Sequence, residues 1–482
     1  MKEKQKSLGV NAVLNAIKSS LSILFPLIIY PYVFRVLHSE NIGRVNFALS
    51  IVSYFSMFAM LGVTQYAVRE GARIRNKSFE LNKFASEIFT INVISTLISY
   101  LLLVLSVLLI DKIYSYSKLI LICSVSILFT TLGIEWINTI FEDFLYVTIR
   151  SIVINIILLV LTFLFVKNEN DIYIYALLSI LGNVLTSLIN WKYCRKYVSI
   201  KITKELNFRK HIKPISILFA NTLATNIYVN SDITMLGWFA GDYNVGIYSL
   251  AVKIYSVVKN IIAAIYTVTV PRISYYLGNN DNENAKKVYT KLVSSIVLLL
   301  LPMSAGIISV SSEIIMFMGG SEYRESIVPL RILGISLIGA ICAGLLTYCL
   351  NIPLGKEKIN FQATLLSAVI NVGLNILLIK ILKQNGAALT TVISEFAVFF
   401  YCLFKCRREL KVYLCYRQVL VNLVHALIGM GIISIISFSV HSIMSYSVIS
   451  LMFVVIISIV LYGCFLTIVK NEIVVEILKK RR

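Results

Sequence analysis

The sequence predicts an all-α integral membrane protein of about fourteen transmembrane helices, built as two six-helix lobes of the same orientation plus two extra C-terminal helices. Three observations predict this fold class. Of the 482 residues, 58% are hydrophobic and only 14% are charged. Apolar stretches long enough to cross a bilayer recur along the whole chain. The first two of these stretches also match, without a gap, the chain 203 residues later, where Asn41 aligns with Asn244.

The composition excludes a water-soluble globule, because such a protein needs far more charged surface. The net charge of +21 is scattered over many short loops, which argues against a nucleic-acid partner. The eight cysteines lie mostly in apolar stretches without a CxxC pair, so we expect buried, reduced thiols and no metal site. The first apolar run, about 8–37, is too long for a cleaved signal and is predicted to be the first transmembrane helix.

Each apolar stretch holds roughly twenty or more residues, enough to cross about 30 Å of hydrocarbon as a helix. The predicted spans are about 9–37, 42–69, 80–110, 116–140, 144–166, 171–193, 212–239, 244–271, 288–310, 325–352, 358–382, 386–404, 418–440 and 446–469. An even number of crossings places both termini on one side of the membrane. Cytoplasmic loops retain an excess of Lys and Arg. With the N-terminus inside, the inner segments hold 32 of these residues and the outer ones 8, so both termini are expected in the cytoplasm.

The internal repeat predicts the domain organisation. Sliding the chain by 203 residues places Gly43 on Gly246 and Arg69 on Arg272. Six helices separate the two copies, so both copies have the same orientation, and a transport pathway is expected between two such lobes. The expected domains are an N-terminal six-helix lobe (1–194), a basic cytoplasmic linker (195–211), a C-terminal six-helix lobe (212–411), and the last two helices with a basic tail (412–482).

Polar residues form stripes on two predicted helices, since residues at i, i+4 and i+7 stand over one another. The stripe on 212–239 is Asn221, Thr225, Tyr228 and Asp232, and that on 244–271 is Ser249, Lys253, Ser256, Asn260 and Thr267. Moved back by 203 residues, these stripes fall on Lys18, Ser22, Phe25 and Ile29, and on Asn46, Ser50, Ser53, Met57 and Thr64. We expect the stripes to face a shared hydrated cavity. The alternative is that these residues join helices by hydrogen bonds.

Ionisable residues far from helix ends are further candidates, because charge at membrane depth is costly. Lys253, Lys259 and Asp232 are expected deep in the bilayer, with a structural ion pair as the alternative to ligand binding. For Arg150 and Arg331, which lie nearer helix ends, snorkelling to the headgroups is the favoured interpretation.

Lys18 also lies near a helix end, but its place on a polar stripe favours the cavity. Asp232, Glu135 and Glu395 are candidate proton or cation sites, and a neighbouring helix is the alternative partner for Glu135 and Glu395. The full set of residues expected at the cavity is Lys18, Ser22, Ser50, Arg150, Asn221, Thr225, Tyr228, Asp232, Lys253, Ser256, Lys259, Asn260 and Arg331.

A cavity with more Lys and Arg than carboxylate predicts an anionic passenger such as a pyrophosphate head. The last two spans carry no Lys, Arg, Asp or Glu from Gln418 to Val469, so they are expected to face lipid or a lipid tail, or to form an inert peripheral hairpin. The HExxH, GxxxxGK[ST] and GxSxG motifs are absent. We therefore expect no catalytic site, no cofactor and no ATP hydrolysis by the chain itself.

Several stretches resemble a known family. Residues 43–55 (GRVNFALSIVSYF) and 66–73 (YAVREGAR) closely resemble the polysaccharide-transporter family of bacterial flippases, within the multidrug/oligosaccharidyl-lipid/polysaccharide exporter superfamily. Residues 31–37 (PYVFRVL) and 354–358 (LGKEK), with the Asn-rich helix that follows, are similar to the same family. The resemblance covers essentially the full chain.

The resemblance implies alternating access between two six-helix lobes and export of undecaprenyl-pyrophosphate-linked repeat units across the bacterial cytoplasmic membrane, for O-antigen or capsule. The expected partners are this glycan and membrane lipids, with a downstream polymerase as a further candidate. Two other functions stay open. An ion-coupled drug or cation antiporter of the same superfamily needs a cavity dominated by carboxylates. A membrane glycan polymerase or ligase usually has large outer loops, whereas the outer loops predicted here are short.

Overall fold

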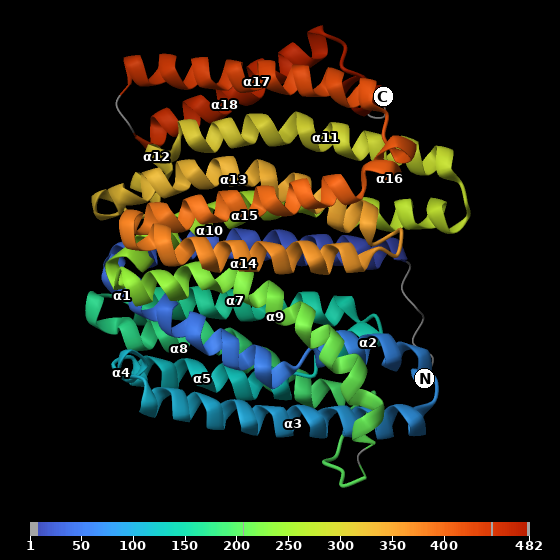
Figure 1. The fold of residues 1–482 in the computed structure, drawn as a ribbon. Helices are drawn as coiled ribbons and strands as arrows, with labels where there is room; N and C mark the ends of the chain where they lie inside the picture. The colour runs from blue at the N-terminus through green and yellow to red at the C-terminus, as the bar shows by residue number, and fades with distance from the viewer. Residues whose placement is uncertain (1–7, 206, 445–446, 480–482) are drawn as a thin grey trace. The chain divides into compact units, whose positions relative to one another are not determined.

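The computed structural model describes residues 8–205, 207–444 and 447–479, which form helices joined by short connections (Figure 1). The chain divides into two compact units, the first ending at Gly246 and the second beginning at Ile247. The first unit contains α1 (Leu8–Met60), α2 (Val63–Ile74), α3 (Ser78–Leu109), α4 (Asp111–Tyr114), α5 (Ser117–Leu132), α6 (Trp136–Ile140), α7 (Phe144–Phe165), the 3-10 helix η1 (Glu169–Asp171), α8 (Ile172–Cys194) and α9 (Phe208–Phe239).

The helix α10 (Asp242–Gly278) begins in the first unit and runs into the second. The second unit continues with α11 (Asn282–Ser309), α12 (Ser311–Met318), the 3-10 helix η2 (Ser321–Ser326), α13 (Ile327–Leu346), the π-helix η3 (Thr347–Asn351), α14 (Glu357–Leu382), α15 (Gln384–Lys405), α16 (Arg407–Tyr413), α17 (Tyr416–Ile443), α18 (Val448–Ile468) and α19 (Glu472–Lys479). The predicted boundaries of four domains stay a prediction.

The protein is an all-α, multi-pass membrane protein. In the described part of the chain, twelve helical segments are long and apolar enough to cross a membrane. The longest, Phe25–Ile74, takes in two predicted spans, and its backbone leaves the helical conformation between them, at His38 (φ 62°, ψ 168°). The helix α9 covers another predicted span, 212–239, and is not one of the twelve. The number of fourteen crossings stays a prediction.

Two of the predicted spans are broken in the structure. The span expected over 42–69 is interrupted after Met60, where Leu61 and Gly62 have φ angles of 47° and 70° and α2 begins in a new direction. The span expected over 116–140 is interrupted after Leu132, where Ile134 has a φ of 38° and the short α6 follows. Glycine adopts the left-handed conformation at little cost, which helps to place the first break at Gly62.

Polar side chains of neighbouring helices satisfy the backbone carbonyls near both breaks. The carbonyl of Ala59 accepts hydrogen bonds from Asn92 Nδ2 (3.2 Å) and Ser95 Oγ (2.5 Å), both on α3. The carbonyl of Gly133 accepts a hydrogen bond from the Asn190 amide on α8. Irregular backbone in a membrane protein needs such partners, because hydrocarbon offers none. The buried Asn and Ser residues of α3 and α8 therefore stabilise the two interruptions.

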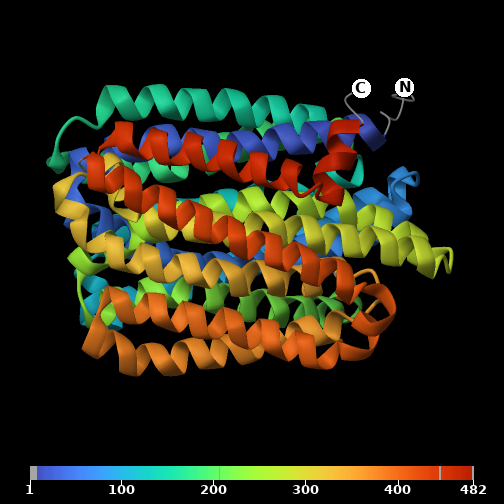
Figure 2. The same ribbon diagram turned by 90° about the horizontal axis from the view of Figure 1, so that it is seen from above.

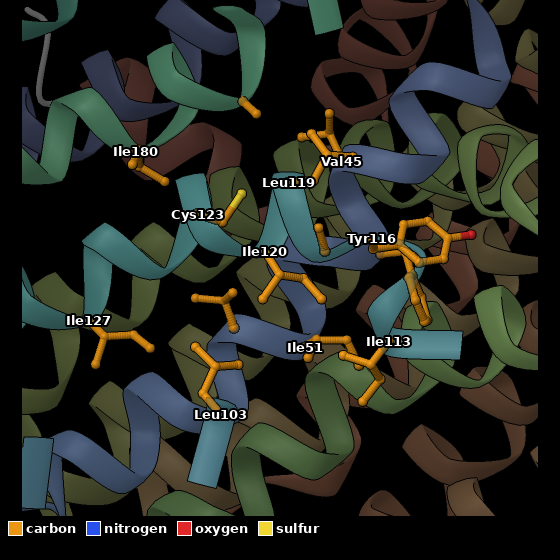
Figure 3. Close-up of a cluster of buried hydrophobic side chains, with 14 of the residues drawn as sticks. Val45, Ile51, Leu103, Ile113, Tyr116, Leu119, Ile120, Cys123, Ile127 and Ile180 are labelled. Carbon is orange, nitrogen blue, oxygen red and sulfur yellow. The ribbon is translucent and has the colours of Figure 1, made fainter. Parts of the chain in front are cut away.

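The core of the first unit is apolar. One cluster joins α1, α3, α4, α5 and α8 through fully or nearly fully buried side chains, many of which Figure 3 draws. In that view Ile51, Ile113 and Ile120 converge from three different helices, and the Tyr116 ring packs at the edge of the cluster. The ring of Tyr116 also contacts the ring of Phe47, with centroids 4.8 Å apart. Burial of these side chains joins the helices of the first unit.

In the second unit, α17 and α18 form a hairpin whose two helices lie side by side in both ribbon views (Figure 2). The hairpin packs on α11, where the Tyr462 hydroxyl donates a hydrogen bond to the carbonyl of Leu298 (2.9 Å). Much of the remaining surface of the hairpin is apolar and exposed, including Phe438 and Ile459. An outward apolar surface of this kind suits contact with lipid chains.

The helix crossing between α1 and the first turns of α10 has the two-fold character that the repeat predicts. A side-chain carbon at Gly43 would collide with the carbonyl oxygen of Asp242, and one at Gly246 would collide with the carbonyl oxygen of Ser39. The two glycines are 203 residues apart, and so are Ser39 and Asp242. Each glycine therefore permits the same close approach, once from each copy of the repeat.

Matching contacts also occur in later helices of the two units: each unit has an ion pair next to a hydrogen bond between Cys and Asn. In the first unit, Asp143 pairs with Lys196 (3.6 Å) and Cys194 Sγ donates to Asn138 Oδ1 (3.4 Å). In the second unit, Lys356 pairs with Glu409 and Cys406 Sγ donates to Asn351 Oδ1 (2.9 Å). We call the two ion pairs, Asp143–Lys196 and Lys356–Glu409, the latches.

The two latches occupy equivalent positions, because Asp143 and Lys356, like Lys196 and Glu409, are 213 residues apart. The sign of each charge is reversed between the units. Burial opposes ionisation of Asp143, but hydrogen bonds from Tyr193 and Tyr197 and the charge of Lys196 outweigh it, so the pKa of Asp143 is lowered. The hydrogen bond from Lys356 lowers the pKa of Glu409.

Candidate functional site

The first unit contains a cavity of about 580 Å³ next to the break between α1 and α2. Its walls come from α1, α2, α5, α8 and α9. We call it the large cavity, and its lining residues are Leu49, Val52, Ser53, Ser56, Met57, Met60, Gly62, Thr64, Gln65, Ser126, Thr130, Ser179, Ile180, Asn183, Thr222 and Asn226. These residues include hydroxyls, amides and aliphatic groups, and none of these sixteen residues is charged or aromatic.

A second cavity of about 170 Å³, the small cavity, adjoins the large one and shares Met60, Thr64, Thr130 and Asn183 with it. Both helix breaks reach these cavities. Gly62 lines the large cavity, and Gly133, Ile134 and Glu135 line the small one. Interrupted helices at a cavity are typical of substrate sites in membrane transporters.

Most hydroxyl groups around the large cavity donate their proton to their own helix. Each of five hydroxyls donates a hydrogen bond of 2.6–3.0 Å to a backbone carbonyl three or four residues earlier. These residues are Ser53, Ser126, Thr130, Ser179 and Thr222. A hydroxyl whose proton is used in this way keeps oxygen lone pairs for other donors. Asn183 supplies an amide to the same wall and donates to Thr130 Oγ1 (3.1 Å).

A buried guanidinium lies beside the small cavity. Arg150 is on α7, its side chain is 4% exposed, and it forms an ion pair with Glu135. It also donates to Asn190 Oδ1 (2.6 Å) and lies over the Tyr146 ring, 5.2 Å from its centroid. The snorkelling predicted for Arg150 is therefore not what the structure has, because the carboxylate and amide of neighbouring helices hold the guanidinium in the protein interior.

Another ion pair with a buried carboxylate lies in the second unit. Lys259 on α10 donates to Glu395 Oε1 on α15 (2.7 Å), and the Tyr255 hydroxyl reaches the same oxygen at 3.4 Å. Glu395 is 7% exposed and Lys259 is 33% exposed in its side chain. A proton or cation site at Glu395 and a ligand site at Lys259 stay predictions. The structure adds that the two residues are partners.

The model of a family described as "Polysaccharide biosynthesis protein" matches residues 8–277, more than half of the chain. The chain belongs to this family. A second family model, MatE, matches residues 217–377. Together these matches place the protein among the polysaccharide transporters of the multidrug/oligosaccharidyl-lipid/polysaccharide exporter superfamily.

Three curated relatives are similar along much of the chain. A Shigella dysenteriae protein described as an O-antigen transporter is 24% identical, over 75% of this chain and 90% of its own length. The Staphylococcus aureus capsular polysaccharide biosynthesis protein CapF is 24% identical, over 78% of this chain and 93% of its own length. Agl15 of Haloferax volcanii, described as a flippase of low-salt glycan biosynthesis, is 26% identical over 48% of each chain.

Two kinds of solved structure share the fold. The lipid II flippase MurJ, in an inward closed conformation, superposes with a TM-score of 0.75 and 19% identity over 96% of this chain and 99% of its own. An inward-facing multidrug transporter of the MATE family superposes with a TM-score of 0.63 and 16% identity over 83% of this chain and 98% of its own. These likenesses confirm the all-α transporter fold that the sequence predicts.

The remaining residues expected at the cavity are dispersed in the structure. Ser50 is buried on α1 and accepts a hydrogen bond from Thr234 of α9 (3.0 Å). Asp232 is buried on α9, whereas Thr225 is exposed and Tyr228 is partly exposed on the same helix. Three members of the stripe on α1 and α2, namely Ser53, Met57 and Thr64, line the large cavity, while Ser50 is not among its lining residues. The sequence thus predicted the polar helix but not which of its residues reach the cavity.

On α10, Lys253 and Ser256 are partly exposed and Asn260 is exposed. Arg331 is exposed on α13 and donates from Nε to Ser311 Oγ (2.8 Å). The side chains of Lys18, Ser22 and Asn221 lie outside the part of the structure that is described. A role in substrate binding stays a prediction for all of these residues.

The sequence did not predict a buried chain of hydrogen bonds in the first unit. His211 is fully buried at the start of α9, with Nε2 2.7 Å from Glu87 and Nδ1 2.8 Å from the Tyr66 hydroxyl. The three residues come from α9, α3 and α2. The signal available in the sequence was a histidine among the basic residues at 201–213, which was interpreted only as part of a charged linker.

Proposed function

We propose that the protein translocates undecaprenyl-pyrophosphate-linked oligosaccharide repeat units across the bacterial cytoplasmic membrane by alternating access, for O-antigen or capsular polysaccharide. The observation that carries this proposal is the extent of the likeness to the lipid II flippase. MurJ aligns over 96% of this chain, whereas the MATE transporters align over 83–84%.

The chemistry of the hairpin α17–α18 supports a lipid passenger. From Gln418 to Val469 it has no Lys, Arg, Asp or Glu, and much of its surface is exposed and apolar. A surface of this kind accepts a polyprenyl tail without desolvating a charge. The relatives described as O-antigen, capsule and glycan proteins support a glycan head. We propose that both termini lie in the cytoplasm and that a polymerase on the outer side receives the product.

We propose further that Lys18 and Lys253, which lie 235 residues apart on two different polar stripes, bind the pyrophosphate. Arg150 and Lys259 carry carboxylate partners, so their charge is largely balanced and their attraction for an anion is weaker. Ser22, Asn221, Thr225, Tyr228, Asp232, Ser256, Asn260 and Arg331 complete the proposed surroundings of the head group.

Reconstitution in liposomes tests the proposal. Purified protein with fluorescent undecaprenyl-pyrophosphate-linked oligosaccharide should move the glycolipid between leaflets, and the Lys18→Ala/Lys253→Ala variant should move it at least about tenfold more slowly, since each charge-assisted hydrogen bond is worth about 1.5–3 kcal/mol. Empty liposomes and a matched exposed variant, Lys405→Ala, are the controls. Protein that folds and inserts but moves no glycolipid contradicts the proposal.

A second function has specific support. The MatE model matches residues 217–377, and Glu135 lines the small cavity, as a coupling carboxylate of a cation or drug antiporter would. The ion pair with Arg150 weighs against it, because a bound guanidinium already neutralises Glu135. Ethidium efflux driven by a proton or sodium gradient in the same liposomes would favour the antiporter.

A further inference from the structure

The large cavity in the first unit is polar but uncharged. Its volume of about 580 Å³ lies within the range of about 300–1,000 Å³ that is typical of small-molecule pockets. Its sixteen lining residues include Ser, Thr, Asn and Gln side chains next to Met, Val, Leu and Ile, with no Lys, Arg, Asp, Glu or aromatic residue among them. Among the lining residues that the structure describes, an anionic or cationic ligand finds no countercharge and no aromatic face.

The direction of the hydrogen bonds narrows the ligand class. The five hydroxyls at Ser53, Ser126, Thr130, Ser179 and Thr222 donate to their own helices, so their oxygens present acceptors to the cavity. A pyrophosphate group has only acceptors and would face them unfavourably. A sugar has many hydroxyl donors and suits them, while its C–H faces suit Val52, Met57 and Ile180.

The position of the cavity also favours a ligand. The helix break at Leu61–Gly62 lies on its wall, and neighbouring amides and hydroxyls satisfy the nearby carbonyl of Ala59. The break therefore forms part of the cavity wall, through Gly62. Asn183 and Thr130 join the large cavity to the small one, so the polar wall continues past the break.

We propose that the large cavity is the subsite for the uncharged sugar portion of the lipid-linked glycan. The inference rests on the proposed function and deepens it, because it separates recognition of the sugar from recognition of the pyrophosphate. The acceptor oxygens of the helix hydroxyls bind sugar hydroxyl protons, and Asn183, Gln65 and Asn226 exchange hydrogen bonds with sugar oxygens. The amine groups of Lys18 and Lys253 are left for the phosphates.

A binding experiment on the unmodified protein tests the ligand class. The probes are the neutral oligosaccharide released by mild acid from the glycolipid that the protein transports, and sodium pyrophosphate. Saturation-transfer NMR on the full-length protein in detergent should detect the oligosaccharide, and the Asn183→Leu variant should weaken its binding by about tenfold, as loss of one or two hydrogen bonds predicts. Detection of pyrophosphate alone, or equal binding to wild type and Asn183→Leu, overturns the proposal.

A transport experiment separates this inference from the proposed function. Two substrates are compared in liposomes: the complete glycolipid and undecaprenyl pyrophosphate without sugar. Thr130→Val and Asn183→Leu should slow the complete glycolipid by about five- to tenfold and leave the sugar-free lipid at the wild-type rate. Thr467→Val is the matched control, since the Thr467 hydroxyl also donates to its own helix, at the carbonyl of Cys464, but on an exposed surface of the second unit.

The outcomes are distinct. If wild type moves neither lipid, the proposed function fails. If wild type moves the glycolipid and the two variants slow both lipids equally or neither lipid, the sugar subsite fails while the proposed function stands. Melting temperatures within a few degrees of wild type establish that the variants are folded. If a variant does not fold, the binding experiment on the wild-type protein decides whether the protein binds the oligosaccharide.

Discussion

The two units form equivalent ion pairs in which the positions of the positive and negative charges are exchanged. At the latch, the first unit places a carboxylate at Asp143 and an amine at Lys196, whereas the second unit places an amine at Lys356 and a carboxylate at Glu409. The adjacent Asn–Cys contacts, Asn138 with Cys194 and Asn351 with Cys406, have the same order in both units. The fold therefore needs attraction at this position, and either arrangement of the charges supplies it.

The units differ where the first one is broken. Leu61 and Gly62 interrupt the helix that begins in α1, whereas the equivalent positions, Ala264 and Ile265, lie inside the continuous α10. The large cavity lies at the interrupted helix of the first unit. Copies of one sequence pattern thus yield a continuous helix in one unit and a cavity wall in the other, and a glycine in place of a β-branched residue permits the difference.

Both units also bury a carboxylate next to a histidine, and here we expect the largest effect. Removing His211 by His211→Ala leaves Glu87 buried without its cationic or hydrogen-bonding partner, and breaking such a pair costs about 3–5 kcal/mol. The free energy of unfolding in detergent should fall by this amount. Adding Glu87→Gln to the variant should restore part of the stability, because it removes the buried charge.

His441→Ala provides the comparison in the second unit, where His441 pairs with the buried Glu313. We expect a comparable loss there, since the carboxylate left without its partner is buried in both units, with side-chain exposures of 0% for Glu313 and 7% for Glu87. Equal stability of wild type and His211→Ala would contradict a stabilising role of the contact between His211 and Glu87.

Exchange of residues at the helix break should have the next largest effect. Gly62→Ile gives the first unit the residue of the second, forces a β-branched side chain to a φ of 70°, and brings its Cβ within 2.8 Å of the Phe219 backbone nitrogen. Such backbone strain costs about 1–3 kcal/mol, and the variant should lose glycolipid transport. The melting temperature and the liposome assay measure both effects.

The reverse exchange, Ile265→Gly, is the matched control. A glycine inside the continuous α10 should cost about 1 kcal/mol through its low helix propensity, with no left-handed residue required. If Ile265→Gly were as damaging as Gly62→Ile, the strain at the break would not be the cause.

A charge exchange at the latch of the second unit should have a smaller effect. Lys356→Glu alone places two carboxylates together at a partly buried position and should destabilise the protein by at least about 1 kcal/mol, the usual upper value for an exposed pair. Lys356→Glu combined with Glu409→Lys recreates the order of charges in the first unit and should recover most of the loss. A double-mutant cycle of chemical unfolding measures the coupling, and additive effects would contradict the equivalence of the latches.

The smallest effect concerns pH. The pKa values of Asp143 and Glu409 are lowered in the folded protein, below the ordinary 3.8 and 4.5. A lowered pKa contributes stability above the unfolded value, and that stability is lost as the pH falls through the folded value. The melting temperature of wild type should therefore decrease more between about pH 5 and pH 3 than that of Asp143→Asn/Glu409→Gln. Parallel pH curves would show that the latches do not contribute.

The sequence by itself determined the membrane class, the family and the parallel repeat. Length and polarity of each stretch decide whether a helix crosses a bilayer, and these are local properties that can be read directly. The match of Gly43 with Gly246 predicted equivalent environments, and the structure has reciprocal close approaches there. The polar stripe that includes Ser53 and Thr64 was also readable from the spacing, whereas the polar residues that α5 and α8 supply to the cavity were not predicted.

Only the tertiary structure decided which charged residues are partners and where the helices break. Arg150 and Glu135 were assigned to separate roles from the sequence, and so were Lys259 and Glu395, whose 136-residue separation gives no local signal. The breaks at Leu61–Gly62 and Ile134 depend on amides of other helices that satisfy nearby carbonyls. Pairing and backbone satisfaction are long-range interactions, so they became visible only when distant helices were brought together.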